Sequence, residues 1–115
     1  PSLLTSHILD LANGKPAQGL KACLYYQNSE NKNWTLVGDD ISNSDGRMPN
    51  LIKQNMKLIE GHYKLVFEAG EYFKKRNLET IYEEIEIKFL IKDSSQKYHI
   101  PLLLNQFGYC TYRGS

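Results

Sequence analysis

A chain of 115 residues without an internal repeat or linker is expected to form a single domain, covering residues 1–115. Its 14 Lys and Arg residues are interleaved with 13 Asp and Glu residues, for a net charge of +1, which argues against a nucleic-acid-binding surface because such a surface needs clustered positive charge. No apolar stretch approaches the ~20 residues that cross a bilayer, and no charged-then-apolar segment opens the chain, so we expect neither a membrane span nor a signal peptide.

Alternating apolar and polar residues predict strands in the first half of the chain. In residues 3–10, one face carries Leu3, Thr5, His7 and Leu9, and the other carries Leu4, Ser6, Ile8 and Asp10. After a turn at residues 13–16, a second strand is predicted over residues 20–27 and a short third one over residues 34–37. A further turn at residues 42–46 ends directly before Arg47.

The second half of the chain is expected to contain four strands and one helix. Strands are expected over residues 62–68, 81–92 and 96–104, a short helix over residues 71–76, and a last strand over residues 107–113. Pro101 favours an edge strand or a bulge at its position, since proline lacks the N–H that a central strand uses. Seven or eight short strands with recurrent turns and one short helix indicate an all-β fold, an antiparallel β-sandwich.

Few residues are suited to chemistry. Histidine occurs three times, as His7, His62 and His99, and no pair has the HxH or HxxxH spacing of a metal site. The chain lacks a G-x-S-x-G elbow and a Gly-rich phosphate loop. Cys23 and Cys110 lack a CxxC spacing, and we expect two buried free thiols rather than a disulfide.

Two further features stand out. Arg47 follows a tight Asp-Gly turn, which would present it at the end of a strand. An aromatic strand runs almost to Ser115, and because most chain ends fray, we expect this one to be anchored.

Taken together, four segments resemble the 5-hydroxyisourate hydrolase family, also called transthyretin-related proteins. Residues 4–10 (LTSHILD) resemble its N-terminal strand, residues 44–47 (SDGR) its central turn, and residues 98–104 (YHIPLLL) its penultimate strand. Residues 112–115 (YRGS) resemble its terminal signature. The segments follow the family's order along the whole chain, with one departure, Cys110, where serine or another small polar residue is expected.

The resemblance implies a transthyretin-like fold that forms a homotetramer, with active sites in a channel between subunits. It implies hydrolysis of the N1–C6 bond of 5-hydroxyisourate, a small-molecule substrate in urate degradation, to 2-oxo-4-hydroxy-4-carboxy-5-ureidoimidazoline. Neither a metal nor an organic cofactor is implied. The catalytic residues that it implies are His7, Arg47, His99 and Ser115, and the substrate-binding residues are Arg47, Tyr112, Arg113, Gly114 and Ser115.

These residue types suit the opening of a cyclic amide. Imidazole, with an ordinary pKa of about 6.5, transfers protons near neutral pH; one of His7 and His99 is expected to be the general base, while the other orients the water or donates a proton. Arg47 can hold ring oxygens in a bidentate fork and stabilise an oxyanion. Ser115 offers a hydroxyl and a carboxylate that could orient a histidine or the substrate.

Two other classes of protein share the predicted fold. A transthyretin-type carrier of small ligands would not need the His, Arg and YRGS set, and a structural or adhesion sandwich would leave all four segments unexplained. The cytoplasm is the expected compartment, with the peroxisome, or the periplasm after loss of a leader, as alternatives; the chain has no C-terminal Ser-Lys-Leu signal.

Overall fold

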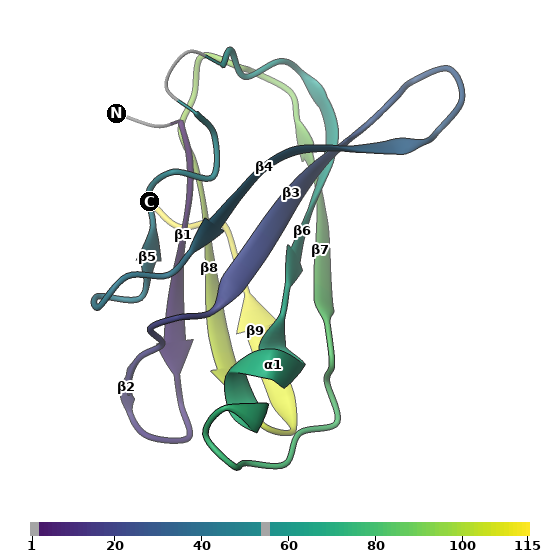
Figure 1. Cartoon of the computed structure of the whole chain (residues 1–115). Coiled ribbons are helices and arrows are strands. Elements are labelled where there is room, and N and C mark those ends of the chain that lie inside the picture. Colours follow the sequence, from purple (N-terminus) through teal and green to yellow (C-terminus); the bar gives the residue numbers. More distant parts are fainter. Residues whose placement is uncertain (1–2, 54–55) are drawn as a thin grey trace.

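The computed structural model describes residues 3–53 and 56–115, which form two facing sheets and one short helix (Figure 1). The strands are β1 (Leu4–Asp10), β2 (Lys15–Pro16), β3 (Lys21–Gln27), β4 (Trp34–Ile41), β5 (Arg47–Met48), β6 (Gly61–Phe67), β7 (Ile85–Ile91), β8 (Tyr98–Asn105) and β9 (Gly108–Thr111), and the helix is α1 (Ala69–Lys74). The first sheet has the order β2-β1-β8-β9, with β5 also paired to β1, and the second has the order β4-β3-β6-β7. The predicted β-sandwich is thereby confirmed.

The core lies between the two sheets and follows the predicted alternation. Leu4 and Ile8 of β1 are fully buried, and so are Leu24 of β3 and Leu65 of β6. Each such side chain contributes roughly 1.5–3 kcal/mol by leaving water. The opposite face of β1, with Thr5, His7 and Leu9, is only half-buried. The outer face of the first sheet is therefore the one that can carry a site.

Strand boundaries differ from the prediction where pairing partners decide them. β4 continues beyond residue 37 because β3 pairs with it as far as Lys21 opposite Ile41. β7 begins at Ile85 rather than at residue 81, because Ile85 pairs with Phe67, the last residue of β6. The chain then turns into α1, which begins at Ala69, two residues before the predicted start.

Two predictions about the sheet are wrong. The sandwich is not wholly antiparallel, because β1 and β8 pair in parallel, from Leu4 opposite Tyr98 to Asp10 opposite Leu104. Of the two alternatives for Pro101, an edge strand or a bulge, the edge strand is wrong, because β8 lies between β1 and β9.

Pro101 is accommodated because the ladder on one side of β8 is interrupted next to it. The paired part of β9 ends at Thr111, opposite Leu102, and pairing resumes at His99 opposite Gly114. Between them, the Thr111 hydroxyl donates to the Pro101 carbonyl at 2.7 Å. The missing N–H of proline thus falls where no ladder bond is made.

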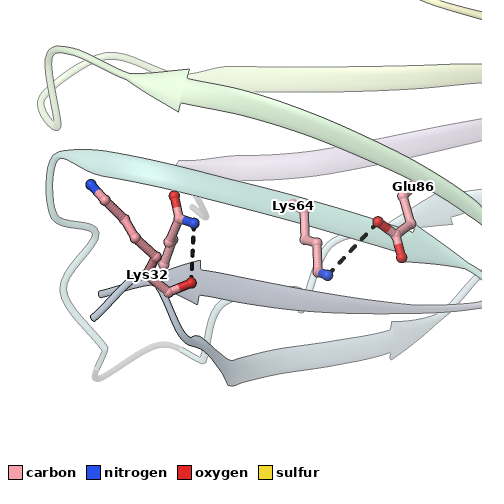
Figure 2. Close-up of polar contacts among 4 residues, drawn as sticks. Lys32, Lys64 and Glu86 are labelled. Carbon is pink, nitrogen blue, oxygen red and sulfur yellow. Dashed lines mark hydrogen bonds and ion pairs between the residues drawn. The ribbon is translucent and has the colours of Figure 1, made fainter. Parts of the chain in front are cut away.

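The outer face of the second sheet carries charged and aromatic side chains. Lys64 Nζ on β6 lies 3.7 Å from Glu86 Oε1 on β7 (Figure 2), and 4.7 Å from the centre of the Trp34 ring. The side-chain amide of Gln27, the last residue of β3, donates to the carbonyl of Lys32 in the following loop at 3.1 Å (Figure 2). The predicted site residues all lie in the other sheet or in the segments attached to it.

Both cysteines are free, as predicted, and they lie in different sheets, Cys23 on β3 and Cys110 on β9. Their expected burial is wrong: Cys23 is half-buried and Cys110 is exposed. Cys110 is the register partner of the half-buried Leu103, so its side chain lies on the outer face of the first sheet. In the part of the chain that the structure describes, no helix is long and apolar enough to cross a membrane.

Candidate active site

The turn at residues 43–47 is held against β1. Gly46 has a φ of +75°, and a Cβ there would lie 2.4 Å from the Ile8 carbonyl oxygen, so only glycine fits. The Ile8 N–H donates to the Gly46 carbonyl at 2.7 Å. The Asn43 side chain accepts hydrogen bonds from the N–H groups of Asp45 and Arg47, both at 3.0 Å. This turn starts β5 and brings Arg47 beside β1.

His7 and Arg47 are register partners in the antiparallel pair of β1 and β5. His7 Nε2 lies 2.8 Å from the Asp45 carbonyl oxygen. A carbonyl oxygen only accepts hydrogen bonds, so Nε2 carries the proton in this contact. The tight turn before Arg47 therefore fixes the ring of His7 as well as the place of the arginine.

His99 on β8 faces the same side of the sheet as Thr5, its register partner on β1. The Thr5 Oγ1 and His99 Nδ1 atoms are 2.8 Å apart. Burial lowers the pKa of His99 below its ordinary 6.5, the positive charge of Arg47 and the neighbouring His7 lower it further, and a hydrogen bond to the Thr5 backbone opposes them. His99 is therefore a neutral imidazole at pH 7, able to accept a proton.

The last residues return to β8 beyond Pro101. The Gly114 N–H donates to the His99 carbonyl at 2.7 Å. The Arg113 guanidinium lies over the Tyr98 ring, 4.4 Å from its centre, and donates to the Lys97 carbonyl at 2.9 Å. The predicted anchoring of this segment is confirmed, and it brings Ser115 next to His99.

A cavity of about 290 Å³ brings these elements together. We call it the His99 cavity; it is lined by Thr5, Ser6, Arg47, Met48, Pro49, Lys97, His99, Gly114 and Ser115. Four of the predicted site residues, Arg47, His99, Gly114 and Ser115, are among these. The cavity also contains two cations, since Lys97 accompanies Arg47.

The remaining predicted residues lie around the His99 cavity. His7 is beside Arg47 and close enough to His99 to affect its pKa, although it does not line the cavity. Tyr112 is 54% exposed, and the Arg113 side chain is directed to Tyr98.

Five lining residues were not predicted from the sequence, namely Thr5, Ser6, Met48, Pro49 and Lys97. The period-two alternation does put Thr5 on the His7 face of its strand, which was the available signal. Nothing in the sequence marked Lys97.

Two larger cavities, of about 730 and 780 Å³, have side chains less suited to amide chemistry. One is lined by Leu3, residues 49–58 in part, and two serines, with no histidine, arginine or carboxylate. The other lies beside α1 and is lined by five glutamates. Within residues 3–53 and 56–115, no three His, Cys, Asp or Glu side chains are grouped so that they could hold a metal ion.

The fold and the His99 cavity define a transthyretin-like β-sandwich with a site of imidazole and guanidinium groups on the outer face of one sheet. Residues 4–114 match the family model described as the HIUase/Transthyretin family. The chain therefore belongs to the HIUase/Transthyretin family.

Individual relatives agree with this membership. A 5-hydroxyisourate hydrolase of Mus musculus is 41% identical over 114 residues, which cover 99% of this chain and 96% of that protein. The solved Klebsiella pneumoniae 5-hydroxyisourate hydrolase is 30% identical with a TM-score of 0.81, covering 97% of this chain and 92% of the other. Transthyretin from Sparus aurata has a TM-score of 0.91 at 23% identity, covering 99% and 97% of the two chains, and this likeness concerns the fold alone.

Proposed function

We propose that this protein hydrolyses the N1–C6 bond of 5-hydroxyisourate to give 2-oxo-4-hydroxy-4-carboxy-5-ureidoimidazoline, a step of urate degradation. One observation carries the proposal: a neutral imidazole, His99, shares a small cavity with the guanidinium of Arg47. The named relatives in a mammal and a bacterium support the same reaction. No metal or organic cofactor enters the proposed mechanism.

His99 is the proposed general base. Its lowered pKa keeps the imidazole unprotonated at pH 7, and Nδ1 is already engaged with Thr5, which leaves Nε2 for a water molecule. Nε2 removes a proton as the water oxygen attacks C6 of the substrate. When the N1–C6 bond breaks, N1 takes the bonding electron pair and a proton, and C6 becomes the carboxylate of the product.

Arg47 is the proposed electrostatic partner. A guanidinium remains charged at every working pH and can donate two parallel hydrogen bonds. In the small cavity, it would stabilise the negative charge that develops on the C6 oxygen. Lys97 would add a second positive charge near the substrate oxygens. N1 would take the proton that His99 has removed from the water, and His7 would orient that water by accepting a hydrogen bond at Nδ1, because its Nε2–H is engaged with the Asp45 carbonyl.

The last four residues are proposed to bind the substrate. Gly114 and Ser115 line the His99 cavity, so the Ser115 hydroxyl and carboxylate can orient the substrate or the base. Tyr112 and Arg113 lie beside it, and we propose that they complete the binding surface once a second subunit faces this sheet.

The proposed assembly is a homotetramer with active sites in a channel between subunits. The His99 cavity lies on the outer face of the first sheet, where Leu9 and Leu103 are half-buried and Tyr112 is largely exposed. A second copy on this face would exclude water from the cavity and strengthen the electrostatic interactions of Arg47. Light scattering coupled to size exclusion would measure the number of subunits.

The proposed compartment of the reaction is the cytoplasm.

Activity on freshly generated 5-hydroxyisourate, followed by ultraviolet absorbance and corrected for spontaneous decay, tests the proposal. We expect disappearance of substrate in proportion to enzyme concentration and formation of the carboxylated product by mass spectrometry. Transthyretin-type carriage without catalysis would instead give saturable binding of an apolar ligand and no acceleration. That second outcome would refute the proposed hydrolase activity.

A further inference from the structure

The ring of His99 is held at Nδ1 by a residue of another strand. Thr5 and His99 face each other across the parallel pair of β1 and β8, and Thr5 Oγ1 lies 2.8 Å from His99 Nδ1. Both side chains line the His99 cavity. Thr5 therefore fixes which nitrogen of the imidazole points away from the cavity.

The opposite edge of the ring is confined as well. A Cβ built on Gly114 would lie 2.6 Å from Cδ2 of His99 and 3.2 Å from Cγ of Pro101, so the chain end passes directly against this edge. A ring flip would exchange Nδ1 and Cδ2 and break the contact with Thr5. Among the described residues, no hydrogen bond reaches Nε2, which is left for the cavity.

The hydrogen-bonding groups of Thr5 determine which ring nitrogen of His99 carries the proton. Besides its hydroxyl, 2.8 Å from Nδ1, Thr5 presents a backbone whose interaction with the ring opposes the lowering of the His99 pKa, and a carbonyl oxygen only accepts hydrogen bonds. A hydroxyl can act in either direction, so it accepts as well when Nδ1 carries the proton. The neutral ring then has Nδ1–H and a free lone pair on Nε2.

We propose that Thr5 is a positioning residue for His99: its hydroxyl holds the Nδ1–H tautomer so that the Nε2 lone pair faces the cavity. The role in catalysis rests on the proposed hydrolysis, while the role in setting the tautomer does not. In this proposal, Thr5 is assigned no direct role on the substrate or the attacking water. Its action is through His99 alone.

Two variants of Thr5 separate the effect of its hydroxyl from the effect of its side-chain volume. Thr5→Val keeps the shape and the backbone carbonyl and removes the hydroxyl, and Thr5→Ser keeps the hydroxyl and removes a methyl group. Thr35→Val is the matched control, because Thr35 is exposed on β4 of the other sheet. Thermal unfolding of all three variants checks that the fold is retained.

The experiment combines tautomer spectroscopy with kinetics. Two-bond proton–nitrogen correlation spectra of protein labelled with ¹⁵N-histidine report which ring nitrogen carries the proton, and His7→Gln and His62→Gln assign the signals. We expect the Nδ1–H form of His99 in the wild type, Thr5→Ser and Thr35→Val, and a mixture of tautomers in Thr5→Val. The kcat of Thr5→Val should fall roughly fivefold to twentyfold, as for loss of one hydrogen bond, with KM within about twofold and near-complete recovery in Thr5→Ser.

Contrary results are equally definite. A wild-type His99 in the Nε2–H form, or a Thr5→Val variant with wild-type spectrum and kcat, would overturn the proposal. If Thr5→Ser were as slow as Thr5→Val, the methyl group rather than the hydroxyl would matter, which also overturns it. Should the wild type fail to hydrolyse 5-hydroxyisourate, the spectra alone would still decide whether Thr5 sets the tautomer.

Discussion

Gly114 lies directly against the imidazole of His99. Its N–H donates to the His99 carbonyl at 2.7 Å, and a Cβ at Gly114 would come within 2.6 Å of Cδ2 of the ring. The segment that resembles the family's terminal signature is therefore in contact with the proposed base.

This contact predicts the effect of adding one methyl group. Gly114→Ala must displace the His99 ring or the chain end, and a displacement of about 1 Å at a reacting group costs roughly 10- to 100-fold in rate. Gly108→Ala is the control in the same hairpin, since its Cβ would have only the Asn105 side chain nearby, at 3.9 Å. Steady-state kinetics should show a loss for Gly114→Ala alone, and equal activities would contradict the close contact.

Removing either histidine near Arg47 should slow the reaction. His7→Ala and His99→Ala are each expected to lower kcat by roughly 10²–10⁴-fold, the usual contribution of a positioned acid or base. His62→Ala should retain wild-type kinetics, because His62 is exposed on β6 of the second sheet. Dependence on His62 without dependence on His7 would show that the site is misassigned.

The acid limb of the rate profile should respond to the charge of Arg47. Only neutral His99 accepts a proton, so kcat/KM falls as the pH drops through its pKa, which lies below 6.5. Arg47→Gln removes a positive charge that lowers this pKa, so the limb should move to higher pH. Arg47→Lys keeps the charge and should leave the limb in place, while loss of the planar fork reduces kcat/KM at least about tenfold. An unmoved limb in Arg47→Gln would exclude the coupling.

A buried hydrogen bond joins the helix to the first strand and should affect stability alone. The Tyr72 hydroxyl of α1 donates to Asp10 Oδ2 at 2.7 Å, and Asp10 is only 1% exposed. Tyr72→Phe should lower the free energy of unfolding by about 1–3 kcal/mol without changing kcat. Tyr82→Phe is the control, since no described hydrogen bond uses the Tyr82 hydroxyl.

The same tyrosine predicts sensitivity to base. Burial first, and then the hydrogen bond and charge of Asp10, raise the pKa of Tyr72 to about 12 from 10 in the unfolded chain. The stabilisation is complete below pH 10 and is lost between pH 10 and about 12, since the unfolded chain releases the proton first. Denaturant titrations should show this loss in the wild type and a smaller one in Tyr72→Phe.

Chelation should have no effect on activity or folding. The proposed mechanism uses imidazole and guanidinium groups throughout, so incubation with EDTA should leave both kcat and the midpoint of thermal unfolding unchanged. Loss of activity in EDTA that zinc restores would instead require a metal in the mechanism.

Local patterns in the sequence determined much of the fold. Alternation predicted which residues of β1 share a face, because strand side chains point to opposite faces with a period of two. The turn before Arg47 could be predicted because the Asp-Gly pair permits a positive φ, which Gly46 adopts. The resemblance of four segments then indicated the site residues.

Only the tertiary structure decided which strands are neighbours. The parallel pairing of β1 with β8 sets Thr5 beside His99, 94 positions apart in the sequence. Pro101 can occupy an interior strand because the C-terminal segment interrupts its pairing with β8 next to it. Neither can be deduced from a single strand, because pairing depends on how all strands together bury their apolar faces. The sequence by itself determined which residues are chemically capable; the packing of two sheets decided that Arg47, His99 and Ser115 share one cavity, because contacts distant in sequence form only when the whole core closes.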